Sequence, residues 1–199
     1  VQGNAIRYVG STRPQGEFGP VYEGKEKLLL PGLVNTHSHS PMTLLRGYAE
    51  NLPLDRWLNE KVFPFEDRIQ GEDAYYAVLL SIAEMLRTGT TSFSDMYFFS
   101  ENVAKAVGDS GIKRNFSRSI VSFEDGDIRS LPSFQESEAM IRQYHGAFEG
   151  RFLMDMSLHA EYTNRFPIME QFAQTAKDHN LRVQIHLSET KKEHEECKQ

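Results

Sequence analysis

The alternation of helix-like and strand-like segments is the feature that most restricts how this chain can fold. Beyond residue 73, stretches with apolar residues at helical spacing alternate with short runs rich in β-branched and aromatic residues. We expect helices at 73–88, 100–107, 134–148 and 168–180, and strands at 90–97, 113–121, 151–159 and 181–187. Strands separated by helices of this length form parallel βα units, in which chemically active side chains gather at the carboxyl ends of the strands.

An earlier apolar run, residues 28–36, ends in two histidines separated by one residue, His37 and His39. Side chains at positions i and i+2 of a strand point the same way, so both imidazoles would project together from the strand's end. Two neutral imidazoles placed in this way can share one metal ion. A bare His-x-His pattern is equally consistent with two unrelated histidines on a strand, so the rest of the sequence must decide.

Polar residues at the ends of the other expected strands favour the metal interpretation. These residues are Asp95, Arg118, His159 and His186. Glu189 follows His186 by three residues, where its carboxylate could carry a proton to or from a water molecule beside the metal. The other histidines fall in helices or loops and are expected at the surface: His145, His179 and His194.

Composition and charge exclude several other classes of protein. The 199 residues are 39% hydrophobic and 25% charged, as in a soluble globular protein. A net charge of −6 without a basic patch argues against a nucleic-acid partner. The single cysteine, Cys197, allows no internal disulfide, and no apolar stretch reaches the roughly 18 residues of a membrane span. We therefore expect a cytoplasmic protein with no signal peptide and no membrane partner.

Other catalytic motifs are weak or missing. Gly-Asp-Ser-Gly at 108–111 is similar to a serine nucleophile motif, but it follows a helix, whereas the nucleophile elbow joins a strand to a helix. No Gly-x-Gly-x-x-Gly phosphate loop occurs, so a nucleotide cofactor has no support. With one cysteine, the chain also lacks the Cys-rich zinc site of the cytidine-deaminase type.

Three ordered motifs resemble the amidohydrolase superfamily: Pro-Gly-Leu-Val-Asn-Thr-His-Ser-His at 31–39, His-Ala-Glu-Tyr-Thr at 159–163 and His-Leu-Ser-Glu-Thr at 186–190. The resemblance is to the branch of 5'-methylthioadenosine/S-adenosylhomocysteine deaminases and related chlorohydrolases. It implies an α/β fold, a distorted (β/α)8 TIM-type barrel with a small β-sandwich and one divalent metal ion.

The same resemblance implies a domain organisation. We expect residues 1–27 to form part of an N-terminal β-sandwich, with short strands near 6–10 and 21–23, and residues 28–199 to form the N-terminal part of the barrel. The family pattern continues with a histidine after strand six and an aspartate after strand eight, and a complete barrel takes about 250 residues. We therefore expect a barrel truncated after about strand five, with an uncovered strand edge that favours a homo-oligomer and with no activity of its own.

By matching positions, the resemblance implies that His37, His39 and His186 are the metal ligands. It also implies that Glu189 is the catalytic acid/base at the substrate and that His159 faces the substrate rather than the metal. Zinc suits a nitrogen-rich ligand set best, and iron, manganese or cobalt suit similar sites.

Three more residues resemble substrate-binding positions of that branch. Trp57 would pack against the nucleoside, Glu66 would bind the ribose hydroxyls, and Arg118 would bind the amino-acid carboxylate of the substrate. Each has a plainer interpretation: a core indole, a solvated charge and an ion-pair partner at a strand end.

The expected function is metal-dependent deamination of an adenine nucleoside, such as S-adenosylhomocysteine, 5'-methylthioadenosine or adenosine, to the inosine analogue and ammonia. A chlorotriazine hydrolase or a guanine deaminase would share the same metal motifs. A barrel that binds or acts as a scaffold without catalysis is the alternative from another class.

Overall fold

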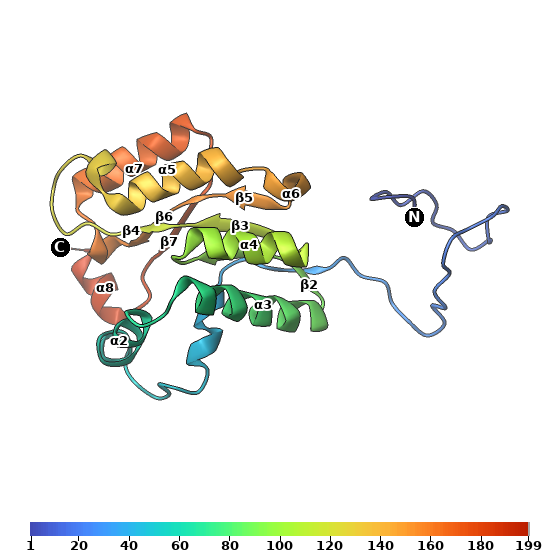
Figure 1. Ribbon diagram of the computed structural model, residues 1–199, viewed down its shortest axis with the longest axis horizontal. Coiled ribbons are helices and arrows are strands. Elements are labelled where there is room, and N and C mark those ends of the chain that lie inside the picture. The colour runs from blue at the N-terminus through green and yellow to red at the C-terminus, as the bar shows by residue number, and fades with distance from the viewer. Residues whose placement is uncertain (199) are drawn as a thin grey trace. The chain divides into compact units, whose positions relative to one another are not determined.

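The computed structural model describes residues 1–198, which fall into two units, Val1–Pro31 and the chain from Gly32 onward. Within the first unit, the described residues form only an isolated antiparallel bridge between Gln2 and Ala5. The second unit, coloured from light blue to red in Figure 1, holds all the helices and strands of the described residues.

The prediction of short strands near 6–10 and 21–23 is wrong, because the backbone there is irregular. A strand needs a neighbouring segment to accept and donate its backbone hydrogen bonds. Val9 and Tyr22 are 85% and 90% exposed, so nothing in the described chain covers the apolar side chains that suggested strands. The assignment of residues 1–27 to a β-sandwich stays a prediction.

The second unit has an α/β fold in which all the strands pair in parallel. One sheet has the order β1-β2-β3-β5 and the other the order β4-β6-β7. Their bounds are β1 Leu33–Asn35, β2 Thr90–Met96, β3 Lys113–Ser117, β4 Ser119–Ile120, β5 Phe152–Met154, β6 Met156–Ala160 and β7 Val183–His186. Only Arg118 separates β3 from β4, and only Asp155 separates β5 from β6. The expected strands at 113–121 and 151–159 are therefore present, each running from one sheet into the other.

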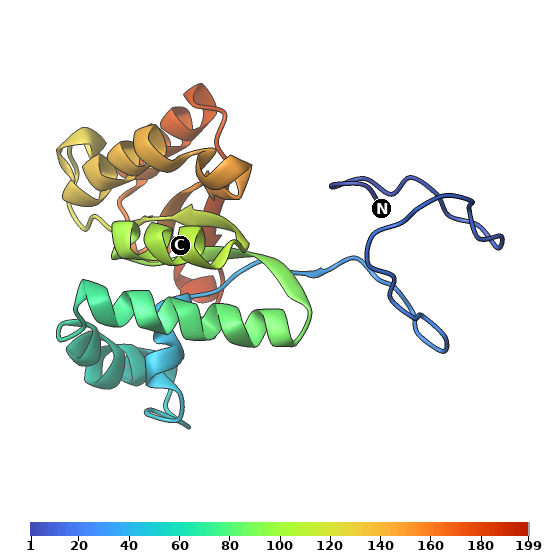
Figure 2. The same cartoon turned by 45° about the vertical axis from the view of Figure 1, so that its right-hand side comes forward.

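Four long helices alternate with these strands and lie along one side of them (Figures 1 and 2). They are α3 Gly71–Arg87, α4 Ser100–Ser110, α5 Pro132–Tyr144 and α7 Phe166–Asp178. The shorter helices are η1 Ser40–Leu45, α1 Leu54–Trp57, η2 Leu58–Val62, α2 Phe63–Glu66, η3 Ile128–Ser130, α6 Ala147–Gly150, η4 Glu161–Thr163 and α8 Lys191–Glu196. The helix expected at 134–148 stops at Tyr144 because Gly146, with φ of 84°, takes the left-handed conformation that ends a helix.

The hydrophobic core lies between the strands and the long helices. Phe93, Phe116 and Phe152 are at most 2% exposed and pack in one cluster with residues of α3 and α4. Ile120 and Leu158 pack in a second cluster with residues of α5 and α7. Because side chains alternate along a strand, residues of the opposite parity point away from the helices.

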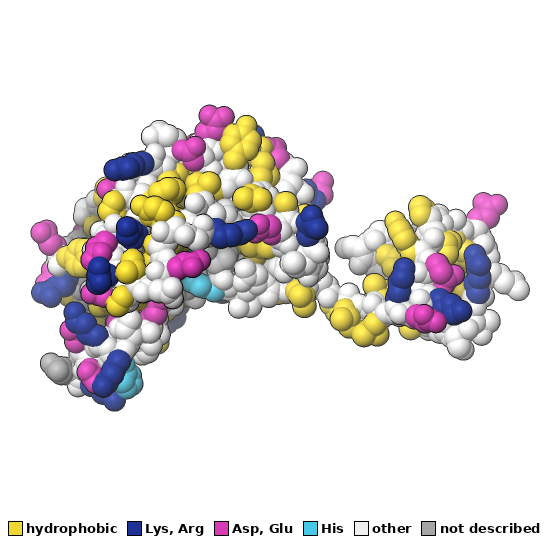
Figure 3. All heavy atoms as spheres, turned by 90° about the horizontal axis from the view of Figure 1, so that it is seen from below, with side chains coloured by type: hydrophobic (Ala, Val, Ile, Leu, Met, Phe, Trp, Pro, Cys, Tyr) yellow, Lys and Arg dark blue, Asp and Glu magenta, His cyan; other side chains and the backbone are white. Residues whose placement is uncertain are grey.

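The outer strands β1 and β7 end their sheets, and their apolar side chains are exposed: Leu33 59%, Val34 63%, Val183 49% and Ile185 37%. β7, the strand expected at 181–187, pairs only with β6 among the described residues, so its other edge has no strand beside it, as expected. On the face of this unit shown in Figure 3, hydrophobic side chains lie in several patches between charged ones. No helix of the described residues is long and apolar enough to cross a bilayer.

Candidate metal centre

Three histidines from distant parts of the chain converge at the carboxyl ends of β1 and β7. His37 and His39 follow β1, and His186 is the last residue of β7. Each offers a ring nitrogen, and these nitrogens lie within 4.8 Å of one another. Nε2 of His186 is 3.2 Å from Nε2 of His37 and 3.1 Å from Nε2 of His39. Parallel strand polarity has thus brought the three imidazoles together.

Backbone carbonyls determine which ring nitrogen of two of these histidines carries the proton. Nδ1 of His39 lies 2.7 Å from the Met96 carbonyl oxygen, and Nδ1 of His186 lies 2.7 Å from the His159 carbonyl oxygen. A carbonyl oxygen only accepts, so both Nδ1 atoms must donate and both Nε2 atoms of the neutral rings hold lone pairs. When both rings are neutral, two Nε2 lone pairs face each other over 3.1 Å, an arrangement that a shared cation stabilises.

The spacing of these nitrogens suits a shared metal ion. Bonds of about 2.0–2.1 Å at tetrahedral angles place two ligand nitrogens about 3.3 Å apart. The separations of 3.1 and 3.2 Å are close to that value. Burial, together with the neighbouring His39 and His186, lowers the pKa of His37, so its imidazole is neutral at pH 7 and one of its ring nitrogens has a free lone pair. The three residues therefore fit a divalent cation in spacing and in donor chemistry.

His159 lies beside this cluster, with its ring centroid 5.1 Å from that of His186. It belongs to β6, on the face turned away from the helices, and its Nδ1 is 3.3 Å from the Thr163 hydroxyl oxygen. Burial, with smaller contributions from His186 and His39, lowers the pKa of His159 to about 4. His159 is therefore a neutral polar group at the edge of the cluster and can exchange hydrogen bonds with a bound molecule.

Glu189 is exposed and lies in the turn between β7 and α8. The preceding residue, Ser188, has a left-handed backbone with φ of 54°. A non-glycine residue in this conformation marks a sharp change of chain direction. The turn leaves Glu189 three residues beyond His186 with its carboxylate open to solvent.

Glu66, at the end of α2, is only partly exposed and accepts a hydrogen bond of 2.5 Å from the Tyr97 hydroxyl. Burial raises the pKa of Glu66, and the Tyr97 hydrogen bond opposes that shift. Glu66 is therefore hydrogen-bonded to Tyr97, the residue that follows β2, and is not a freely solvated charge. Trp57, in α1, is half-buried.

Arg118 forms an ion pair with Glu136 of helix α5. Its Nε donates to Glu136 over 2.7 Å, and its Nη1 donates to the Ser119 carbonyl over 2.7 Å. Glu136, on α5, also accepts a hydrogen bond of 2.6 Å from Ser100. The ion-pair interpretation of Arg118 thus describes what the structure shows, and a substrate carboxylate would compete with Glu136 for this guanidinium.

Sequence reasoning missed the role of Asp95 and did not consider Arg114. Both are buried, 0% and 1% exposed, and they form an ion pair between β2 and β3. The signal was available: Phe93 and Asp95 alternate on one face of β2, Tyr97 follows in the same alternation, and Phe93 and Tyr97 pack in the core. A carboxylate on a core-facing position must find a partner.

Curated proteins of similar sequence are named as deaminases of adenine nucleosides. A 5'-deoxyadenosine deaminase of Methanothermobacter thermautotrophicus is 39% identical over 97% of this chain and 45% of its own length. A 5-methylthioadenosine/S-adenosylhomocysteine deaminase of Thermoanaerobacter pseudethanolicus is 37% identical over 98% of this chain and 45% of its own length. The chain thus spans a little under half the length of the curated relatives it matches.

Solved structures give the same picture. A zinc-bound adenosine deaminase from Xanthomonas campestris is 32% identical, with a TM-score of 0.72 over 81% of this chain and 37% of its own. The guanine deaminase of E. coli, 24% identical with a TM-score of 0.69 over 82% of this chain and 39% of its own, shares the fold. The sequence pattern described as "Amidohydrolase family" matches residues 28–199. This chain, with its converging histidines at parallel strand ends, therefore belongs to the amidohydrolase family.

Proposed function

We propose that this chain supplies the metal-binding and substrate-binding residues of a hydrolase that deaminates adenine nucleosides. The observation that carries the proposal is the convergence of three ring nitrogens: the Nε2 atoms of His37 and His39 lie 3.2 and 3.1 Å from Nε2 of His186, a spacing that suits ligands of one metal ion. The names of the relatives support the choice of substrate: S-adenosylhomocysteine, 5'-methylthioadenosine, 5'-deoxyadenosine or adenosine. The products would be the inosine analogue and ammonia.

The three histidines would hold one divalent ion, for which zinc is our first choice. Such an ion lowers the pKa of a bound water molecule to about 7 and so provides a nucleophile for the amine-bearing ring carbon. The Nδ1 donations of His39 and His186 keep their Nε2 lone pairs turned toward the ion. Glu189 would carry one proton of the attacking water to the ring nitrogen, and would then move the proton of the newly added hydroxyl group to the amine, which leaves as ammonia.

Four side chains would bind the nucleoside. His159, neutral beside the cluster, would exchange a hydrogen bond with the substrate. Trp57 offers an aromatic surface, and Glu66, oriented by Tyr97, can accept two hydrogen bonds from a ribose diol. Arg118 would bind a carboxylate only by sharing or leaving Glu136.

The finer architecture belongs to the same proposal. Parallel strands alternating with helices, and the likeness to solved amidohydrolases, support assigning residues 28–199 to the N-terminal part of a (β/α)8 barrel. We assign residues 1–27 to a β-sandwich on resemblance alone. A small-molecule substrate, a cytoplasmic location, homo-oligomer formation and the absence of nucleic-acid and membrane partners are kept as predictions.

The test is ammonia release by full-length protein supplied with zinc. The panel consists of S-adenosylhomocysteine, 5'-methylthioadenosine, 5'-deoxyadenosine and adenosine, with guanine and a chlorotriazine as rival substrates. We expect turnover of the adenine nucleosides, and loss of both zinc and activity in His39→Asn. His179→Asn, which changes an exposed histidine at the end of α7, is the matched control and should keep both.

Two outcomes would overturn the proposal in different ways. Turnover of guanine or of the chlorotriazine alone would reject the substrate and leave the metal site standing. Zinc binding without turnover of any compound would favour a non-catalytic barrel.

A further inference from the structure

The buried carboxylate of Asp95 contacts the segment that carries His37 and His39. It lies on β2 with 0% exposure, on the face that packs against the helices. Ionised carboxylates are almost never fully buried unless they are paired and hydrogen-bonded. The partners of Asp95 therefore indicate why it is there.

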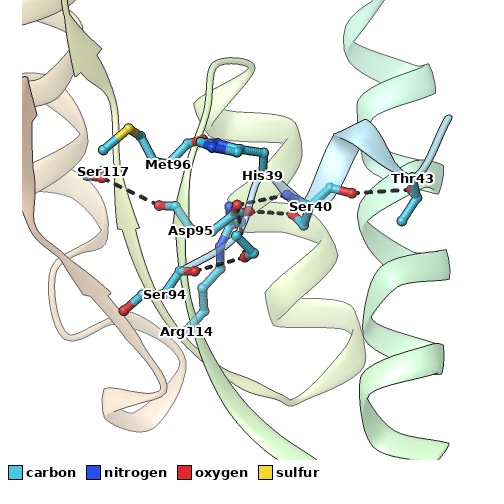
Figure 4. A network of polar contacts seen from close by, with 9 residues as sticks. His39, Ser40, Thr43, Ser94, Asp95, Met96, Arg114 and Ser117 are labelled. Atoms are coloured by element: carbon cyan, nitrogen blue, oxygen red, sulfur yellow. Dashed lines mark hydrogen bonds and ion pairs between the residues drawn. The ribbon is translucent and has the colours of Figure 1, made fainter. Parts of the chain in front are cut away.

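Two of those partners are the serines on either side of His39, Ser38 and Ser40, and Figure 4 shows Ser40 beside Asp95. The Ser40 backbone N–H donates to Oδ1 of Asp95 over 2.8 Å, and the Ser40 hydroxyl donates to Oδ2. The Ser38 hydroxyl lies 3.2 Å from Oδ1 and 2.8 Å from the Ser94 carbonyl oxygen, so one proton is shared between two acceptors. Asp95 thus binds the chain just before and just after a candidate metal ligand.

The backbone after Asp95 completes the attachment. The Met96 N–H donates to the Ser38 carbonyl over 3.0 Å, and the Met96 carbonyl accepts from Nδ1 of His39 over 2.7 Å. The end of β2 therefore holds His39 through its own ring and through both neighbouring residues. This fixes both the position and the rotation of the imidazole.

Arg114 forms a buried ion pair with this carboxylate. It lies on β3, is 1% exposed, and its Nη2 donates to Oδ2 of Asp95. Its guanidinium carbon is 5.1 Å from the ring centroid of Phe93 and 4.5 Å from that of Phe116. Within the described chain, Nε and Nη1 of Arg114 have no hydrogen-bond partner. The guanidinium therefore offsets the negative charge of Asp95 in the core through one charge-assisted hydrogen bond.

We propose that Asp95 is a positioning residue that holds His39 in place for a metal ion by binding the serines on either side of it, an inference that rests on the proposed function. Arg114 acts one step further back, through Asp95. Groups that orient a metal ligand from behind commonly change metal affinity by about 10–100-fold when they are removed.

The test measures metal affinity in full-length protein stripped of metal. Zn²⁺ is titrated against a chromophoric chelator, and Co²⁺ is added separately so that its visible spectrum reports the coordination geometry. Ser40→Ala removes one hydrogen bond to Asp95 and leaves the ion pair intact, and we expect about tenfold weaker Zn²⁺ binding with an altered Co²⁺ spectrum. Asp95→Asn should weaken binding by up to about 100-fold.

Ser137→Ala is the matched control. Ser137 is 1% exposed, and its hydroxyl donates to carbonyl oxygens of Ser133 and Arg118, away from the histidines. It should leave Zn²⁺ affinity within about twofold and the Co²⁺ spectrum unchanged. Equal effects of Ser40→Ala and Ser137→Ala would show that Ser40 and Asp95 only stabilise the fold, and unchanged affinity in a folded Ser40→Ala protein would overturn the inference.

Three further results would each have a definite meaning. If Asp95→Asn fails to fold, Ser40→Ala alone decides. If the unmodified protein binds zinc but deaminates no nucleoside, the proposed function fails and the affinity comparison still stands. If the unmodified protein binds neither Zn²⁺ nor Co²⁺, both the proposed function and this inference are rejected.

Discussion

Removing the Tyr97 hydroxyl should weaken nucleoside binding without disturbing the metal site. Tyr97 is 4% exposed, and its hydroxyl donates the 2.5 Å hydrogen bond that holds Glu66. Tyr97→Phe keeps the ring, which stacks on Phe98 with centroids 4.2 Å apart, and removes only this bond. The change therefore isolates one contact behind the proposed ribose-binding carboxylate.

The expected size follows from the type of bond. A hydrogen bond to a charged group contributes about 1.5–3 kcal/mol, which corresponds to about 10–100-fold in affinity. Glu66 would contact the ribose rather than the reacting carbon, so the contact should be equal in the bound substrate and the transition state. We therefore expect KM for 5'-methylthioadenosine to rise by up to this factor, with kcat changed little.

The pH dependence gives a second readout of the same change. Burial raises the pKa of Glu66 and the Tyr97 hydrogen bond lowers it, so loss of the hydroxyl should raise this pKa further. Glu66 would then take up a proton at higher pH. The acid-side fall in kcat/KM should move to higher pH, because kcat/KM reports groups of the free enzyme.

The assay is ammonia release by full-length, zinc-loaded protein at a series of pH values. Tyr75→Phe is the matched control, because it also removes a tyrosine-to-carboxylate bond, 2.8 Å to Asp109, but between α3 and α4. It should leave KM and the pH profile unchanged. A folded Tyr97→Phe protein with unchanged KM and an unshifted acid limb would refute the assignment of Glu66 to the substrate.

Glu136→Gln should free Arg118 and raise kcat/KM for S-adenosylhomocysteine relative to that for 5'-methylthioadenosine. Arg118→Met should lower this ratio by about tenfold, the effect of one charge-assisted hydrogen bond. Equal changes for both substrates would exclude binding of the substrate carboxylate by Arg118. Zinc at 100 times its Kd should add about 2.7 kcal/mol to the free energy of unfolding, seen calorimetrically as a higher Tm that a chelator reverses, and a Tm insensitive to zinc would contradict the metal site. With a pKa lowered to about 4, His159 of metal-free protein should stay neutral near pH 7 and titrate by NMR well below 6.5, the usual value for histidine. Because protonation of His159 then favours the unfolded chain, the fold should lose stability through this residue as the pH falls below about 6.5, and an NMR midpoint at 6.5 would contradict the burial of His159.

Most of the secondary structure was readable from local pattern. The helices α3, α4, α5 and α7 and the strands they separate were expected from periodicity, which depends on neighbours a few residues apart. The strands expected near 6–10 and 21–23 failed for the complementary reason. A strand is completed by its partner, and no local pattern states whether a partner is present.

The candidate site divides in the same way. The His37-x-His39 spacing and the strand-end position of His186 are local facts, and parallel strand polarity was enough to predict that they meet. The proton positions of His39 and His186 could not be read from the sequence. They depend on carbonyls of Met96 and His159, which other strands bring into contact.

The sequence by itself determined the α/β alternation, the parallel strands and the three histidines at strand ends, because periodicity and motif spacing are properties of short segments. Only the tertiary structure decided that Arg118 pairs with Glu136 and that Asp95 accepts hydrogen bonds from the serines on either side of His39. The partners of Arg118 and Asp95 lie 18 and 55 residues away. Whether such a charge faces a ligand, the solvent or another charge depends on strand register and helix packing, which bring together side chains that no local pattern relates.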